Sequence, residues 1–223
     1  MVQQQHGTIE RPTDRAELAE EHSRICWFLS ILFLNCPTEE SLLALQQQIS
    51  SQHGQITLEP ASGLARVFEV LSKGVNKALV ERLAVEHTRL FCGLSRDTGP
   101  LPPYESLYRS DSMMGKVTLA VMDTYRQAGY GTIEEDAGPQ DHIAAELRFM
   151  AILFYNETVA LYEGDQLTAA TQRQQQNYFL NEHLLQWVPA YCKRIKTETT
   201  ESFYTGVAMM TEDALELLAG TTG

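Results

Sequence analysis

Apolar positions recur at helical spacing along most of the chain. The clearest stripe follows Pro139 and consists of Ile143, Leu147, Met150 and Phe154, at i, i+4, i+7 and i+11. This spacing places all four side chains on one face of a helix. No stretch of several residues alternates between apolar and polar side chains within turn signals, as a half-buried strand would. The sequence therefore predicts an all-helical fold.

Cap and turn residues divide this pattern into separate helices. The predicted helices cover approximately residues 14–35, 38–50, 62–73, 76–91, 111–128, 141–162, 166–187, 190–195 and 198–218. Pro189 is expected to separate the 166–187 helix from the short one after it, because proline disrupts a helix interior. We expect a single globular bundle of roughly eight to ten helices, with residues 1–12 as a frayed tail and 13–223 as one domain.

Composition narrows the class of protein. The chain has 223 residues, 43% hydrophobic and 21% charged, as is ordinary for a folded soluble protein. Its net charge of −12, from 17 basic and 29 acidic residues, argues against nucleic-acid binding and favours a cationic partner such as an arginine-bearing peptide. With neither a long apolar run nor a secretory leader, we expect a cytoplasmic protein without stable membrane insertion.

Most motifs of catalytic and metal chemistry are missing. Neither a phosphate-binding loop, nor a G-x-S-x-G elbow, nor a Glu-x-x-His pair occurs, so we predict no cofactor and no metal. One constellation remains in Asp141, His142 and Glu146. His142 and Glu146 share a helix face, so they could act as an acid/base pair, while Asp141 could simply cap the helix and leave a polar edge beside the core. A small helical hydrolase or metal-dependent enzyme using these three residues is therefore the alternative function.

A second candidate site is the loop that ends at Pro102 and Pro103. Two prolines stiffen the chain and remove backbone donors, which would hold the following tyrosine and carboxylate ready for a partner at low entropic cost. Glu105 could form a bidentate pair with an arginine, and Tyr104 could supply an apolar anchor. The competing interpretation is that the tyrosines fill the groove between two helices.

Three segments in this order resemble the TorD/DmsD family of chaperones for molybdenum-cofactor redox enzymes. They are EHTRLFCG (86–93), PPYESLY (102–108) and GPQDHIAAELRFM (138–150). The resemblance depends on Leu90-Phe91-x-Gly93, on Pro103-Tyr104-Glu105-Ser106 followed by Tyr108 and Gly115, and on Pro139-x-Asp141-His142 leading into Glu146. HLLQWVPAYCKRI (183–195) is similar to the family's late helix pair. The similarity covers about residues 15–218, although Tyr104 stands where many members carry Trp.

The resemblance implies a non-enzymatic, cytoplasmic, client-specific chaperone. Such a protein binds the twin-arginine leader and the apo form of a molybdopterin oxidoreductase of the DMSO or TMAO reductase type, assists cofactor insertion and delays export. The peptide-binding residues would be Leu90, Phe91, Pro103, Tyr104, Glu105, Ser106, Tyr108, Asp141, His142 and Glu146. Guanine-nucleotide affinity has been proposed in the family, but this chain has no phosphate loop to support it.

The resemblance also bears on oligomeric state. Family members can exchange helices between protomers, and identical elements swap at hinge segments. The two candidate hinges here lie near residues 92–103 and 129–138. We expect a monomer with a domain-swapped dimer as a minor species.

Overall fold

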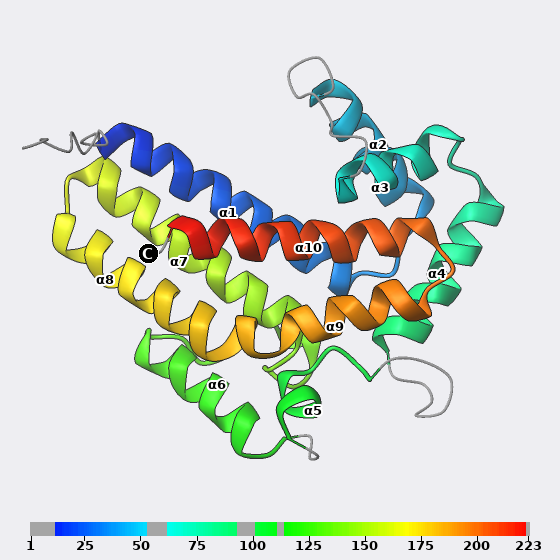
Figure 1. Cartoon of the computed structure of the whole chain (residues 1–223). Helices are drawn as coiled ribbons and strands as arrows, with labels where there is room; N and C mark the ends of the chain where they lie inside the picture. The colour runs from blue at the N-terminus through cyan, green and yellow to red at the C-terminus, as the bar shows by residue number, and fades with distance from the viewer. Residues whose placement is uncertain (1–11, 53–61, 93–100, 111–113, 222–223) are drawn as a thin grey trace, which may run out of the picture.

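The computed structural model describes residues 12–52, 62–92, 101–110 and 114–221, and the elements within them are helical (Figure 1). The elements are α1 (Pro12–Leu34), α2 (Glu39–Gln52), α3 (Gly63–Ser72), α4 (Lys77–Phe91), α5 (Glu105–Arg109), α6 (Lys116–Gln127), the 3-10 helix η1 (Glu135–Ala137), α7 (Ile143–Glu163), α8 (Gln166–Phe179), the π-helical turn η2 (Leu180–Leu184), α9 (Leu185–Glu198) and α10 (Ser202–Thr221). The predicted all-helical bundle is confirmed, and no strand occurs in the described ranges.

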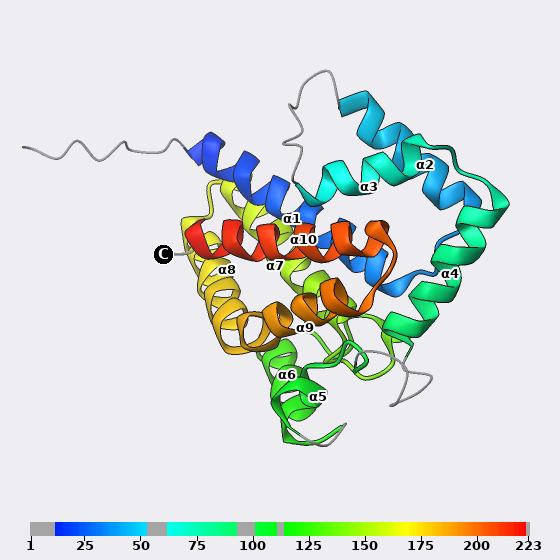
Figure 2. The ribbon, with the colours of Figure 1, turned by 45° about the vertical axis from the view of Figure 1, so that its right-hand side comes forward.

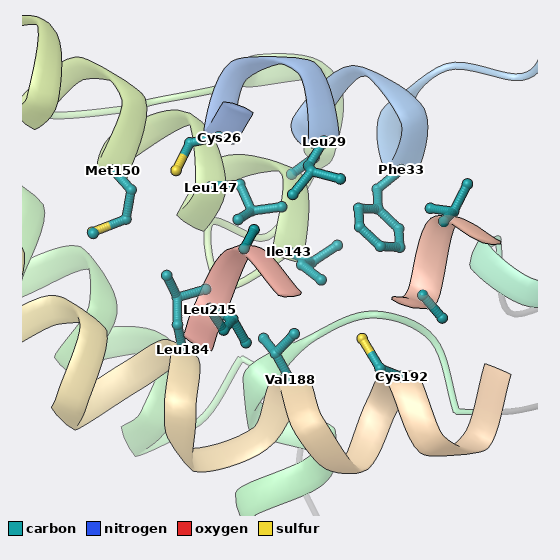
Figure 3. Packing of buried hydrophobic residues seen from close by; sticks show 14 of the residues in the cluster. Cys26, Leu29, Phe33, Ile143, Leu147, Met150, Leu184, Val188, Cys192 and Leu215 are labelled. Carbon is teal, nitrogen blue, oxygen red and sulfur yellow. The ribbon is translucent and has the colours of Figure 1, made fainter. Parts of the chain in front are cut away.

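Helix α7 lies in the middle of the bundle, with α1 along one side and α8 along another (Figures 1 and 2). The Ser23 hydroxyl of α1 donates to the Ala151 carbonyl of α7 at 2.8 Å, and the His22 and Phe154 rings meet edge to face at 5.1 Å. Figure 3 shows side chains from α1, α7, η2, α9 and α10 converging on one core. The stripe predicted after Pro139 is buried there, which fixes the position of the start of α7.

A backbone-to-backbone contact joins α3 to α10. A Cβ atom added at Gly63 would lie 2.4 Å from the Gly206 carbonyl oxygen, and one added at Gly206 would lie 2.6 Å from the Gly63 carbonyl oxygen. Neither distance can accommodate a side chain. These two glycines therefore let the helices cross in direct contact, which brings α3 onto the rest of the bundle.

Several predicted helix ends are confirmed. Ser62 caps α3 and Asn76 caps α4 through their side chains, and Gly164 ends α7 in the left-handed conformation with φ 78°. The first helix differs from its prediction, because it begins at Pro12 rather than at the capping-box pattern of Asp14. Residues 1–11 of the predicted tail and residues 93–100 of the first predicted hinge lie outside the described residues.

The prediction for Pro189 is wrong, because this residue lies inside α9. The π turn Leu180–Leu184 widens the helix just before it and joins α8 to α9 without a loop. The helix continues through Pro189 even though a proline ring ordinarily clashes with the carbonyl one turn earlier. The sequence contains no recognisable signal for a π turn.

Substituting Gly206 tests the close crossing of α3 and α10. We expect Gly206→Ala to lower the free energy of unfolding by about 1–3 kcal/mol, because the added methyl overpacks against the Gly63 carbonyl and Val67. Gly220→Ala is the matched control in the same helix, since nothing lies within 4 Å of its added Cβ. It should stabilise by about 0.5–1 kcal/mol through helix propensity. Denaturant unfolding measures both variants, and equal stabilities would refute the close contact.

Candidate functional site

The loop that ends at Pro103 is attached to the start of α7 by its backbone. The Ile143 N–H donates to the Pro103 carbonyl at 2.9 Å, and the Glu105 N–H donates to the Asp141 carbonyl at 2.8 Å. Between these two bonds, Tyr104 and His142 form an isolated antiparallel bridge. The two motifs that the sequence analysis selected are therefore in direct contact, 38 positions apart in the chain (142 minus 104).

Asp141 caps α5, and the prediction that it caps the helix after it is wrong. Its Oδ2 accepts the Ser106 N–H at 2.9 Å, at the start of α5. His142 is the N-cap of α7 instead, because its Nδ1 accepts the Ala144 N–H at 3.1 Å. The backbone bridge accounts for the shift, since it holds His142 extended, with φ −75° and ψ 139°, as the residue before the first turn of α7. The other oxygen, Oδ1, is buried without a partner.

His142 is a neutral, buried ring. Burial, with a smaller contribution from the neighbouring His87 ring, lowers the pKa of His142 to about 4. A neutral imidazole also suits the cap, because Nδ1 must accept a hydrogen bond. The Tyr104 ring meets it edge to face at 5.1 Å. His142 therefore packs against the Tyr104 ring and does not present a charged side chain to solvent.

Glu146 is a buried carboxyl group whose pKa is raised by its surroundings. It is completely buried, and its Oε2 accepts the Trp187 indole N–H at 3.0 Å while Oε1 has no hydrogen-bond partner. Burial first, and then the negative charge of Glu105, raises the pKa of Glu146 well above its ordinary value. His142 and Glu146, proposed as an acid/base pair in the alternative function, are both shielded from solvent.

Glu105 is fully buried and balanced by two basic partners. Arg109, one turn later on α5, forms an ion pair with its carboxylate, and the His183 Nδ1 lies 2.9 Å from Oε2. Three members of this cluster were not predicted from the sequence, namely Arg109, His183 and Trp187. Their one signal is that His183 and Trp187 occur in the segment 183–195, which resembles the family without indicating any contact.

The other predicted site residues differ in their access to solvent. Pro103 and Ser106 are buried, as are Leu90 and Phe91, the latter packed against Phe33 with ring centroids 5.3 Å apart. Leu90 and Phe91 are thus core residues of α4, without a surface for a peptide in this conformation.

Tyr104 and Tyr108 remain partly exposed. The Tyr108 hydroxyl donates to the Leu101 carbonyl at 3.0 Å, and its ring lies 5.4 Å from that of Trp187. Tyr104 lies next to the end of the acidic link, which is the segment 129–138 between α6 and α7. A Cβ atom added at Gly138 would be 3.9 Å from the Tyr104 hydroxyl oxygen. The turn just before Gly138 carries two exposed carboxylates, Glu135 and Asp136. The Tyr104 hydroxyl thus lies beside the glycine that follows this acidic turn.

Neither a group of metal ligands nor a helix able to cross a membrane occurs in the described ranges. No group of three or more His, Cys, Asp and Glu side chains there is arranged to hold a metal ion. Among the same residues, no helix combines the length and the apolar character needed to cross a bilayer.

Comparison with known proteins identifies the family. Residues 58–193 match the sequence model described as the nitrate reductase delta subunit. The chain is 30% identical over 209 residues to the chaperone protein TorD of Aliivibrio salmonicida, covering 89% of this chain and 93% of that protein. It is 27% identical to the TorD of Vibrio cholerae serotype O1 (El Tor Inaba N16961), covering 86% and 88%, and 29% identical to that of Photobacterium profundum, covering 83% and 87%. The chain therefore belongs to the nitrate reductase delta subunit family, and within it to the TorD chaperones, which are not enzymes.

Proposed function

We propose that this chaperone acts in the cytoplasm on a molybdopterin oxidoreductase of the DMSO or TMAO reductase type. It binds the twin-arginine leader and the apo form of that client, assists insertion of the cofactor and delays export. The observation that carries the proposal is the surface at Tyr104. This partly exposed ring is held by the backbone bridge to His142, and its hydroxyl lies beside Gly138, which follows the exposed carboxylates Glu135 and Asp136. A leader of this kind offers arginines followed by an apolar segment, and such a surface suits both.

Five of the ten residues predicted to bind the peptide have one of two roles in this proposal. Tyr104 and Tyr108 meet the leader directly, because they are the two that remain partly exposed. Asp141, His142 and Glu105 position them, since each is buried and bonded within the chain. Positioning by rigid contacts lowers the ordering entropy that binding must overcome.

Charge supports the same partner. The chain carries a net charge of −12, so it attracts cationic segments at long range and at low salt. Glu135 and Asp136 are exposed, whereas Glu134 of the same link is paired with Arg148. The exposed carboxylates of Glu135 and Asp136 are suited to contact the leader arginines, because an arginine side chain forms bidentate hydrogen bonds with a carboxylate.

Calorimetry with a synthetic twin-arginine leader tests the function. We expect roughly micromolar affinity, about −8 kcal/mol, from a modest apolar anchor and partly exposed charge contacts. Replacing both leader arginines by Lys should weaken binding less than replacing them by Ala, because lysine keeps the charge but loses the bidentate geometry. Absence of heat and of competition with every molybdoenzyme leader encoded beside this gene would contradict the proposal.

Capping-neutral substitutions separate binding from folding at the motif. Asparagine caps a helix about as well as aspartate, so Asp141→Asn and His142→Asn should change unfolding free energy by less than about 1 kcal/mol. We expect each to weaken leader binding by about tenfold, equivalent to ~1.4 kcal/mol, because the support beneath Tyr104 changes in charge or shape.

The matched control for these substitutions is Asp165→Asn. Asp165 caps α8 through a 3.0 Å bond from the Thr168 N–H, and it is exposed and outside the motif. It should bind the leader like wild type. Asp141→Asn and His142→Asn variants with lower melting temperatures but unchanged leader affinity would assign these residues a purely structural role.

A domain-swapped dimer is proposed as the minor species in solution. The link from Gly129 to Gly138 is one of its two candidate hinges, and both of these glycines have positive φ, 91° and 70°. We expect light scattering to detect mostly monomer with a small, slowly exchanging dimer fraction that grows at high protein concentration. A single species at all concentrations and pH values would rule out this proposal.

A further inference from the structure

His183 reaches the motif from a distant part of the chain. It lies 78 positions after Glu105, is 3% exposed, and places its Nδ1 2.9 Å from Oε2 and 3.2 Å from Oε1 of that carboxylate. Hydrogen bonds to a buried carboxylate are strong, since little solvent competes for either partner. His183 is thus a hydrogen-bonded link, shielded from water, between α5 and the α8–α9 side of the bundle.

The imidazole of His183 is held at both ring nitrogens. The Thr124 hydroxyl, which donates to the Ala120 carbonyl at 3.0 Å, lies 3.2 Å from the other ring nitrogen, His183 Nε2. The Phe179 ring packs against the imidazole with centroids 4.7 Å apart. Rotation of the imidazole would break both hydrogen bonds, so its position toward Glu105 is fixed.

The π turn brings α5 and His183 together through a second contact. Arg109 donates to the Glu182 carbonyl, within the π turn, at 2.7 Å, and it also pairs with Glu105. Glu105 and Arg109 lie one turn apart on α5, so both ends of this short helix attach to the same turn. π turns are rare in helices and are frequently found at functional sites.

Helix α5 depends on these attachments. It has five residues, which is too few for a helix to be stable by itself in water. Its first turn is capped by Asp141, and its side chains are fastened by His183 and the Glu182 carbonyl. Tyr104 directly precedes α5 and Tyr108 lies within it, so the orientation of both rings follows from the position of this helix.

We propose that His183 is a positioning residue for leader recognition, which clamps Glu105 and thereby holds Tyr104 and Tyr108 where the leader meets them. The proposal rests on the proposed function for its binding consequence. Its structural part, the clamp on α5, stands independently of any leader.

The test compares His183→Ala with His183→Gln in the full chain. Two quantities are measured, the affinity for a synthetic twin-arginine leader by calorimetry and the hydrogen exchange of the α5 amides. We expect His183→Ala to weaken leader binding by about tenfold and to speed α5 exchange by about tenfold or more, because the helix loses a buried hydrogen-bonded attachment. His183→Gln keeps a donor for Glu105 and should recover part of both losses.

His22→Gln is the matched control. His22 is also a buried histidine, 2% exposed, but it packs on Phe154 in the α1–α7 contact. This variant should lower thermal stability while leaving leader affinity and α5 exchange as in wild type. A general effect of destabilisation on binding would appear in both variants, whereas the clamp predicts it in His183→Ala alone.

Wild-type α5 exchange and wild-type leader affinity in His183→Ala would overturn the clamp. If the leader binds neither wild type nor variants, the proposed function fails while the exchange data still decide the clamp. Should His183→Ala not fold, Thr124→Val removes the partner of Nε2 with little change in shape. It should speed α5 exchange by about two- to threefold, and unchanged exchange there would count against the proposal equally.

Discussion

Burial of carboxyl groups is the constraint on which this structure depends. Glu105, Asp141 and Glu146 are each completely buried, and their hydrogen-bond partners lie on α5, η2 and α9. A buried carboxylate is tolerated only when it is paired, hydrogen-bonded or neutral. Glu105 has Arg109 and His183, Asp141 has the Ser106 N–H, and Glu146 accepts the Trp187 N–H while burial raises its pKa. Each solution fixes a different pair of elements, so the polar cluster determines how the loop, α5, α7 and the π turn fit together.

The polar cluster also holds the exposed rings of the site in a defined position. The backbone bridge between Pro103–Glu105 and Asp141–Ile143 holds the loop, and the rings of Tyr104 and Tyr108 lie over buried partners, His142 and Trp187. Aromatic side chains with two rotatable bonds contribute contact area at low entropic cost when their bases are fixed. Rigid support for a few exposed rings is therefore an economical arrangement for recognising a short flexible peptide.

Sequence patterns were sufficient for the helices and insufficient for the contacts between them. The apolar stripe after Pro139 and the caps Ser62, Asn76 and Gly164 are local signals, and local signals predicted their elements correctly. Asp141 was placed on the wrong helix because an N-cap one residue along, His142, takes the role when a bridge from a distant loop holds the chain extended. His183 was not predicted at all, since a π turn and a partner 78 positions away leave no periodic trace. Burial of Leu90 and Phe91 was likewise decided by packing on Phe33, and not by the motif in which they occur.

The pairing of α1 with α7 has a consequence for synthesis of the chain. Ser23 and its acceptor Ala151 are 128 positions apart, so α1 is complete long before its main neighbour exists. At typical rates of bacterial translation, this separation corresponds to roughly 6–26 s during which the apolar face of α1 lacks its native cover. Pairing of such distant segments must also overcome the entropy of closing a long loop, which slows folding compared with a bundle of sequential neighbours. During the first seconds of its own synthesis, this chaperone therefore exposes an apolar helix face that α7 later buries.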